Sequence, residues 1–121
     1  MATMTGPQEA YRRVEFDARV QGADSRQLVT VCFEQLVGAL GTAIHANRIG
    51  DRLLRSCSLT RALSAVTALQ LGVSGDGGVA DALRHVYEAA RQAMLDSALD
   101  FDAEALNRVR TDFTEISAAF R

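Results

Sequence analysis

The stretch that decides the fold is DSRQLVTVCFEQLVGALGTAIHAN, residues 24–47. Its apolar residues recur every three or four positions, which is the period of an α-helix, and no run shows the alternation of a strand. One set forms a stripe that we expect to face a core: Leu28, Val31, Cys32, Leu36, Ala39, Leu40, Ala43 and Ile44. Val29, Phe33 and Val37 form a second row at i+4 spacing. A helix that is apolar over more than half its circumference is central in its fold, or is covered by another segment on its second face.

A shorter helix is predicted before this stretch. Pro7 suits the first turn of a helix, because its missing N–H would have no partner there in any case. Tyr11, Val14 and Ala18 follow at helical spacing, and Gly22 then interrupts the pattern.

Three more helices follow after short breaks. Gly50 suits the left-handed position after a helix and Asp51 can cap the next one, so this short connection predicts antiparallel neighbours. Residues 71–78 are dense in turn-forming residues and separate the third helix from the fourth. Asp100 or Asp102 can cap the last helix. The predicted core residues of these helices are Leu59, Ala62, Leu63, Val66 and Leu69, then Val79, Leu83, Val86, Tyr87, Ala90, Met94 and Ala98, and finally Leu106, Val109, Phe113, Ile116 and Phe120.

Together these segments predict an all-α fold, an antiparallel four-helix bundle with an additional short N-terminal helix. A chain of 121 residues forms a single domain, because two domains would each be too small to bury a good core. We expect residues 24–120 to form the bundle and residues 1–22 to form a mobile N-terminal segment.

The composition excludes several classes of function. The formal net charge of −2 lacks the basic excess of a nucleic-acid-binding protein. All 13 basic residues are arginine, which excludes lysine chemistry and the lysine of a phosphate-binding loop. We expect Cys32 and Cys57 to be buried, reduced thiols. No signal peptide is visible and no apolar run approaches the roughly 20 residues that span a bilayer, so a cytoplasmic protein without membrane insertion is predicted.

The sequence offers no catalytic, cofactor-binding or metal site, so an enzyme is not predicted. The only histidines are His45 and His85, and neither belongs to the Glu-x-x-His pairs of di-metal bundles. A histidine phosphotransfer domain is an alternative, because such domains are also four-helix bundles with one exposed histidine. Glu88 argues against it, since a carboxylate three residues after His85 would repel a phosphoryl group.

Several stretches stand in an order and spacing that are distinctive only in combination. They are Ala10-Tyr11, Ala23-Asp24-Ser25-Arg26-Gln27-Leu28, Val31-Cys32-Phe33-Glu34, Gly50-Asp51, Gly77-Gly78-Val79-Ala80-Asp81-Ala82-Leu83, Val86-Tyr87, and a last helix opened by Asp102 that carries Leu106 and Val109. With this pattern, over about residues 11–120, the chain resembles the FliS family of flagellin export chaperones.

The resemblance implies a function in binding. Members of that family hold the C-terminal segment of newly made flagellin in the cytoplasm, prevent its premature polymerisation and present it to the flagellar type III export apparatus. Such a client is amphipathic and disordered before assembly, so its carrier needs apolar grooves. The second apolar row of residues 24–47 is surplus surface of this kind. In the family, the N-terminal segment can cover part of the binding surface.

We therefore predict a set of partner-binding residues that form the flagellin groove or its N-terminal lid: Tyr11, Val14, Leu28, Val29, Phe33 and Val37. The alternatives are a purely structural contact between the second row and the N-terminal helix, a helical adaptor with a regulatory task, and a chaperone for a different export client. Components of the export apparatus, and a second copy of the chain in a homodimer, stay open as further partners.

Overall fold

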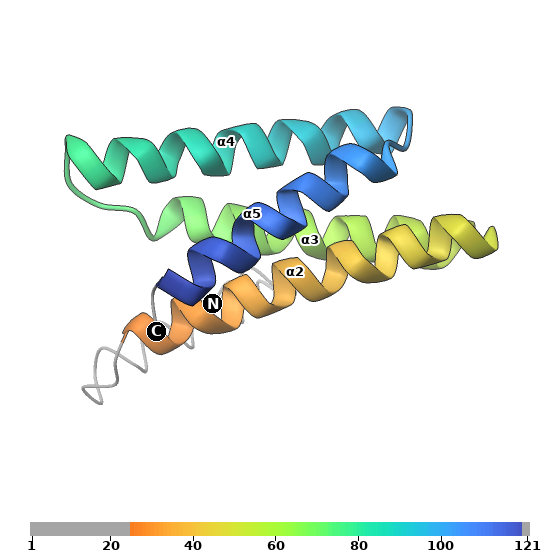
Figure 1. Ribbon diagram of the computed structural model, residues 1–121, viewed down its shortest axis with the longest axis horizontal. Coiled ribbons are helices and arrows are strands. Elements are labelled where there is room, and N and C mark those ends of the chain that lie inside the picture. Colours follow the sequence, from red (N-terminus) through yellow and green to blue (C-terminus); the bar gives the residue numbers. More distant parts are fainter. Residues whose placement is uncertain (1–24, 120–121) are drawn as a thin grey trace, which may run out of the picture.

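The computed structural model describes residues 25–119, which form four α-helices and no strand (Figure 1). The helices are α2 (Ser25–Ile49), α3 (Arg52–Leu71), α4 (Gly78–Leu99) and α5 (Ala103–Ala119). The all-α prediction is therefore confirmed for this part of the chain. The predicted N-terminal helix, with Tyr11 and Val14, and the last residue of the predicted seam, Phe120, lie outside the described residues.

The four helices run alternately up and down, and each packs against two others. α2 lies beside α3, α3 beside α4 and α4 beside α5, and α5 then returns to α2 and closes the ring. In Figure 1, α5 crosses diagonally from the end of α4 to the beginning of α2. Helices that are neighbours in sequence are thus neighbours in space, and only the α2–α5 pair brings together distant parts of the described chain.

The turn between α2 and α3 is fixed by local hydrogen bonds, as the sequence predicts. Gly50 has a φ of +79°, a left-handed conformation that glycine adopts at little cost. Its N–H donates to the Asn47 carbonyl at 3.3 Å and the Asp51 N–H donates to the Ala46 carbonyl at 2.9 Å, which is the pattern of a Schellman motif. Asp51 then caps α3, because its carboxylate accepts the Leu54 N–H at 3.0 Å.

The turn between α4 and α5 lies at the same end of the bundle (Figure 1). Of the two predicted caps, Asp102 caps α5, since its carboxylate accepts the Ala105 N–H at 3.0 Å. Asp100 instead ends α4, where its N–H donates to the Asp96 carbonyl at 2.9 Å. The Asp102 N–H also donates to the Ser97 hydroxyl at 3.2 Å, which ties the start of α5 to the end of α4.

Arg55 of α3 joins these two turns. Its Nη1 donates to the Asn47 side-chain carbonyl at 2.8 Å, and its guanidinium carbon lies 5.3 Å from the centre of the Phe101 ring. A cation over an aromatic face is attracted by the ring quadrupole. One side chain therefore connects the end of α2, the start of α3 and the α4–α5 turn.

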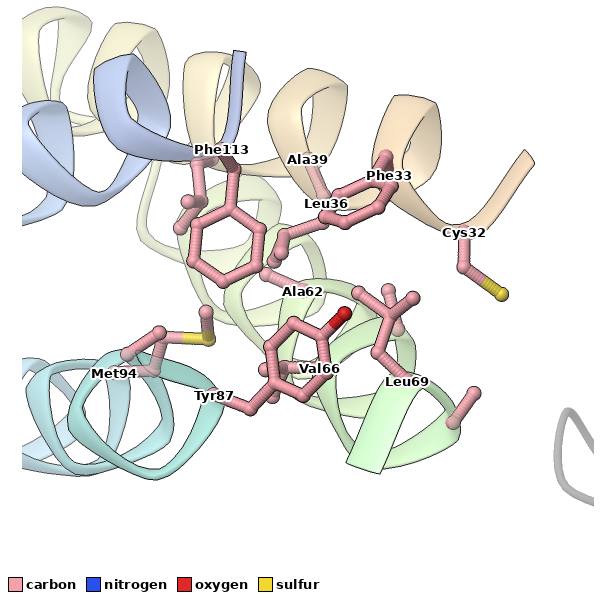
Figure 2. Packing of buried hydrophobic residues seen from close by; sticks show 14 of the residues in the cluster. Cys32, Phe33, Leu36, Ala39, Ala62, Val66, Leu69, Tyr87, Met94 and Phe113 are labelled. Carbon is pink, nitrogen blue, oxygen red and sulfur yellow. The ribbon is translucent and has the colours of Figure 1, made fainter. Parts of the chain in front are cut away.

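Three aromatic rings form the centre of the core (Figure 2). Phe33 of α2, Tyr87 of α4 and Phe113 of α5 are each at most 2 % exposed. Their centroids are 6.4 Å apart for Phe33 and Tyr87, 5.7 Å for Phe33 and Phe113, and 5.8 Å for Tyr87 and Phe113. These are favourable separations for offset or edge-to-face pairs, each worth about 0.5–1.5 kcal/mol beyond the area buried. The rest of this cluster comes from all four helices and includes Leu36, Leu40, Leu59, Val66, Leu69, Met94 and Leu106.

The rotation of α2 about its axis differs from the prediction in one respect. Val31, assigned to the core stripe, is 50 % exposed, whereas Phe33, assigned to the second row, is 1 % exposed. Residues two positions apart point about 200° apart around a helix, so Val31 and Phe33 cannot both face the core. The core lies between the two predicted rows, because α2 packs against α3 on one side and α5 on the other.

Other predictions about burial were wrong, since Val79 and Ala98, assigned to the core side of α4, are both exposed. Cys32 is buried, but Cys57 is exposed, because the side of α3 that faces the core carries Ser58, Leu59 and Ala62 instead. Neither cysteine is in a disulfide. Within the described residues, Gln27–Ile49 is long and apolar enough to cross a membrane by length and composition alone, with a mean hydropathy of 1.4. This is weak grounds for a span, since the core helix of a bundle meets the same criterion and the apolar side of α2 packs against α3 and α5.

Phe113→Ala tests the aromatic core. We expect the free energy of unfolding to fall by about 3–5 kcal/mol, because the variant loses both the ring's burial and its two ring contacts. Urea denaturation followed by circular dichroism measures the change. Thr111→Ala, at an exposed position of the same helix, should change stability by less than about 0.5 kcal/mol. A loss below about 1 kcal/mol for Phe113→Ala would contradict this account of the core.

Candidate functional site

A groove opens on the surface between the first half of α2 and the last turns of α5. Its volume is about 340 Å³. In Figure 1 these two segments lie side by side at the lower left. Among residues 25–119, the lining consists of Phe33, Glu34, Val37 and Gly38 from α2 and of Thr114, Ser117 and Ala118 from α5.

Short side chains produce this groove. Ser117 and Ala118 lie one turn after Thr114, so the three share the side of α5 that faces α2, and none is large enough to fill the seam. Gly38 offers no side chain from the other helix. The apolar surface of the groove comes from Val37, which is half-buried against the core, and from the exposed Ala118, while Phe33 lies beneath it at 1 % exposure.

Two of the six predicted binding residues, Phe33 and Val37, meet in this groove. Phe33 is chiefly a core residue, so the expectation that its row stands apart from the core was wrong for this side chain. Leu28 and Val29 are half-buried on the first turns of α2 and do not line the groove. Tyr11 and Val14 lie outside the described residues. The binding role of all six stays a prediction.

Five lining residues were missed by the sequence analysis: Glu34, Gly38, Thr114, Ser117 and Ala118. A signal was present, since small residues at 114, 117 and 118 form an i, i+3, i+4 set on one side of a helix. These residues were not predicted because the binding residues were chosen as large apolar side chains, whereas these three are small.

Two polar groups of the groove, the Thr114 hydroxyl and the Gly38 carbonyl, are hydrogen-bonded within their own helices. The Thr114 hydroxyl donates to the Arg110 carbonyl at 2.8 Å, and the Thr42 hydroxyl donates to the Gly38 carbonyl at 3.0 Å. Glu34 is the one charged lining residue; it is exposed and has no ion-pair partner within residues 25–119. The groove therefore suits an apolar guest, with a carboxylate at its rim.

No group of three His, Cys, Asp or Glu side chains that could hold a metal ion occurs among the described residues. The two histidines are exposed on different helices, and His45 Nδ1 lies 3.2 Å from a guanidinium nitrogen of Arg48. Neither histidine lines the groove.

Among the titratable groups of the described helices and turns, Tyr87 is the one whose pKa the structure clearly shifts. Burial raises the pKa of its phenol above the ordinary value of 10.0, and the nearby Cys32 thiol raises it further. The charged form is disfavoured in both cases, because the phenolate would lie in an apolar core beside a group that can become negative. The phenol therefore stays neutral at physiological pH and acts as a packing group.

Comparison with known proteins gives one family. The family model described as "Flagellar protein FliS" matches residues 7–121, which includes all four described helices and every residue that lines the groove. None of the curated proteins matches the chain.

The raised pKa of Tyr87 predicts a loss of stability in alkali. The folded pKa lies above the unfolded one, so the contribution is fully present below about pH 10 and is lost as the pH rises through the folded pKa. We expect the free energy of unfolding to fall between about pH 8 and about pH 11, and Tyr87→Phe to reduce that fall. Urea denaturation of both proteins at the two pH values measures the difference. Tyr11 is present in both proteins, so its own titration cancels, and an equal fall in the two would contradict the assignment.

Proposed function

Since the chain belongs to the FliS family of flagellar proteins, we propose that it is a cytoplasmic export chaperone that holds the C-terminal segment of flagellin in the groove between α2 and α5. The family implies a flagellar export chaperone in general terms. The finer assignment, to flagellin and to this groove, rests on the groove's apolar lining in the seam between α2 and α5.

The chemistry of the groove supports a client of this kind. A disordered segment that folds on binding loses conformational freedom, which typically costs about 2–5 kcal/mol, and the burial of apolar surface must offset that cost. Val37 and Ala118 supply such surface. The Thr114 hydroxyl needs no partner from the guest, because it already donates to a carbonyl of its own helix. By covering the apolar side of the client's C-terminal segment, the groove would keep flagellin from polymerising before its delivery to the export apparatus.

The N-terminal segment is proposed as a lid over the same surface. Residues 1–22 directly precede α2, whose first turns carry Leu28 and Val29 and whose next turns line the groove. Tyr11 and Val14 are the apolar groups that a lid needs. A cover from the same chain shields the apolar groove from water when no client is bound. It also raises the apparent Kd for the client, because only the fraction of molecules with an open groove can bind.

Ala118→Arg tests the groove as the client site. Ala118 is exposed at the groove's edge, so the substitution should leave the fold intact and place a long cation where the client packs. We expect calorimetric titration with the C-terminal peptide of flagellin to give a Kd at least about tenfold higher than that of the unsubstituted protein, which corresponds to roughly 1.4 kcal/mol.

Ala119→Arg is the matched control, because Ala119 is also exposed on α5 but does not line the groove. Its Kd should equal that of the unsubstituted protein. Equal affinities for Ala118→Arg and Ala119→Arg would place the client elsewhere. If the unsubstituted protein bound no flagellin peptide, the proposed function itself would be wrong.

A double variant, Tyr11→Ala with Val14→Ala, tests the lid. We expect tighter peptide binding, because a weakened cover leaves a larger fraction of the protein open to the client. The same titration measures it. Weaker binding would mean that these side chains contact the client, and an unchanged Kd would mean that they do not lie over the groove.

A further inference from the structure

Gly38 stands in the interior of α2 without a need for glycine that the described residues explain. It has no left-handed φ, and a Cβ placed on it would meet no atom of the described part of the chain within 4 Å. Glycine in the interior of a helix is less stable than alanine, because it loses more conformational freedom on folding. Alanine at position 38 would therefore give a more stable α2 than glycine does.

Gly41, one turn further along α2, is different. A Cβ there would lie 3.7–3.8 Å from the guanidinium group of Arg110 on α5, in ordinary van der Waals contact. The small residue at 41 thus gives room to a side chain of the same molecule. At 38 the corresponding space is empty, and it belongs to the groove.

The guest of this groove must satisfy its own backbone hydrogen bonds. The walls are the flanks of two α-helices, whose N–H and C=O groups are bonded along each helix, so they offer no edge to an extended strand. A helical guest brings its backbone already paired. Such a helix inserts side chains as knobs into holes formed by small residues of the facing helices.

We propose that Gly38 is the point of closest approach between this protein and its client: the missing Cβ, with Thr114 and Ala118 opposite, forms a hole that receives one apolar side chain of an amphipathic helix of flagellin. The proposal rests on the function proposed above. It makes Gly38 a specificity-determining residue, since any side chain at position 38 would occupy the space that the guest's apolar side chain needs. The carboxylate of Glu34, one turn earlier and without an ion pair within residues 25–119, favours a basic residue on the guest near that end.

The test compares stability with affinity in the full-length protein. Gly38→Ala should raise the urea midpoint, because alanine favours the helix, and should also raise the Kd for the flagellin C-terminal peptide by about threefold or more. Gly38→Leu, with a larger side chain that also suits a helix, should raise the Kd by about tenfold or more. Gly41→Ala is the matched control: the same substitution in the same helix should leave the Kd within about twofold of the original.

The outcomes separate this inference from the proposed function. Unchanged affinity in both Gly38 variants, with Ala118→Arg still weakening binding, would overturn the role of Gly38 and leave the groove as the client site. A lowered urea midpoint for Gly38→Ala would also overturn it, because the fold itself would then need glycine. Unchanged affinity in the Gly38 variants and in Ala118→Arg, or no peptide binding at all, would overturn both.

Discussion

The contact among Phe33, Tyr87 and Phe113 is the interaction on which the described structure depends. Tyr87 belongs to α4, which packs on α3 and α5 and lies diagonally opposite α2, so the rings connect helices that are not neighbours in the ring. Phe113 holds α5 against α2 immediately before Thr114 and about one turn before Ser117 and Ala118, the residues of α5 that line the groove. Phe33 is common to the core and the groove. The position of the groove is therefore set by the packing of the core, and a change that loosens the core also loosens the groove.

Features that depend on local sequence were predicted well. The left-handed Gly50, the caps Asp51 and Asp102 and the buried Phe113 each follow from a few adjacent residues or from one seam. The rotation of α2 was predicted less well, since Val31 is exposed and Phe33 is buried. Two apolar rows on one helix are compatible with several rotations, and the positions of the partner helices decide among them.

The groove could be predicted only in part from the sequence. Phe33 and Val37 were found because they are large and apolar, whereas Gly38, Thr114 and Ala118 contribute by leaving space. Empty space between two helices arises when a small residue of one meets small residues of the other, and the sequence alone does not say which turns of α2 and α5 lie opposite each other. The client was inferred from the resemblance to a family and not from any residue pattern.

The order in which the helices pack around the bundle also bears on the order in which the protein folds during synthesis. The α2–α3, α3–α4 and α4–α5 contacts join segments that follow one another along the chain, and contacts of this local kind form quickly. The α2–α5 seam closes the longest loop and needs the last segment to be synthesised, so it is expected to form at the end of folding. The groove is built from that seam. A nascent chain whose α5 has not yet been synthesised would therefore lack the groove that we propose as the client site.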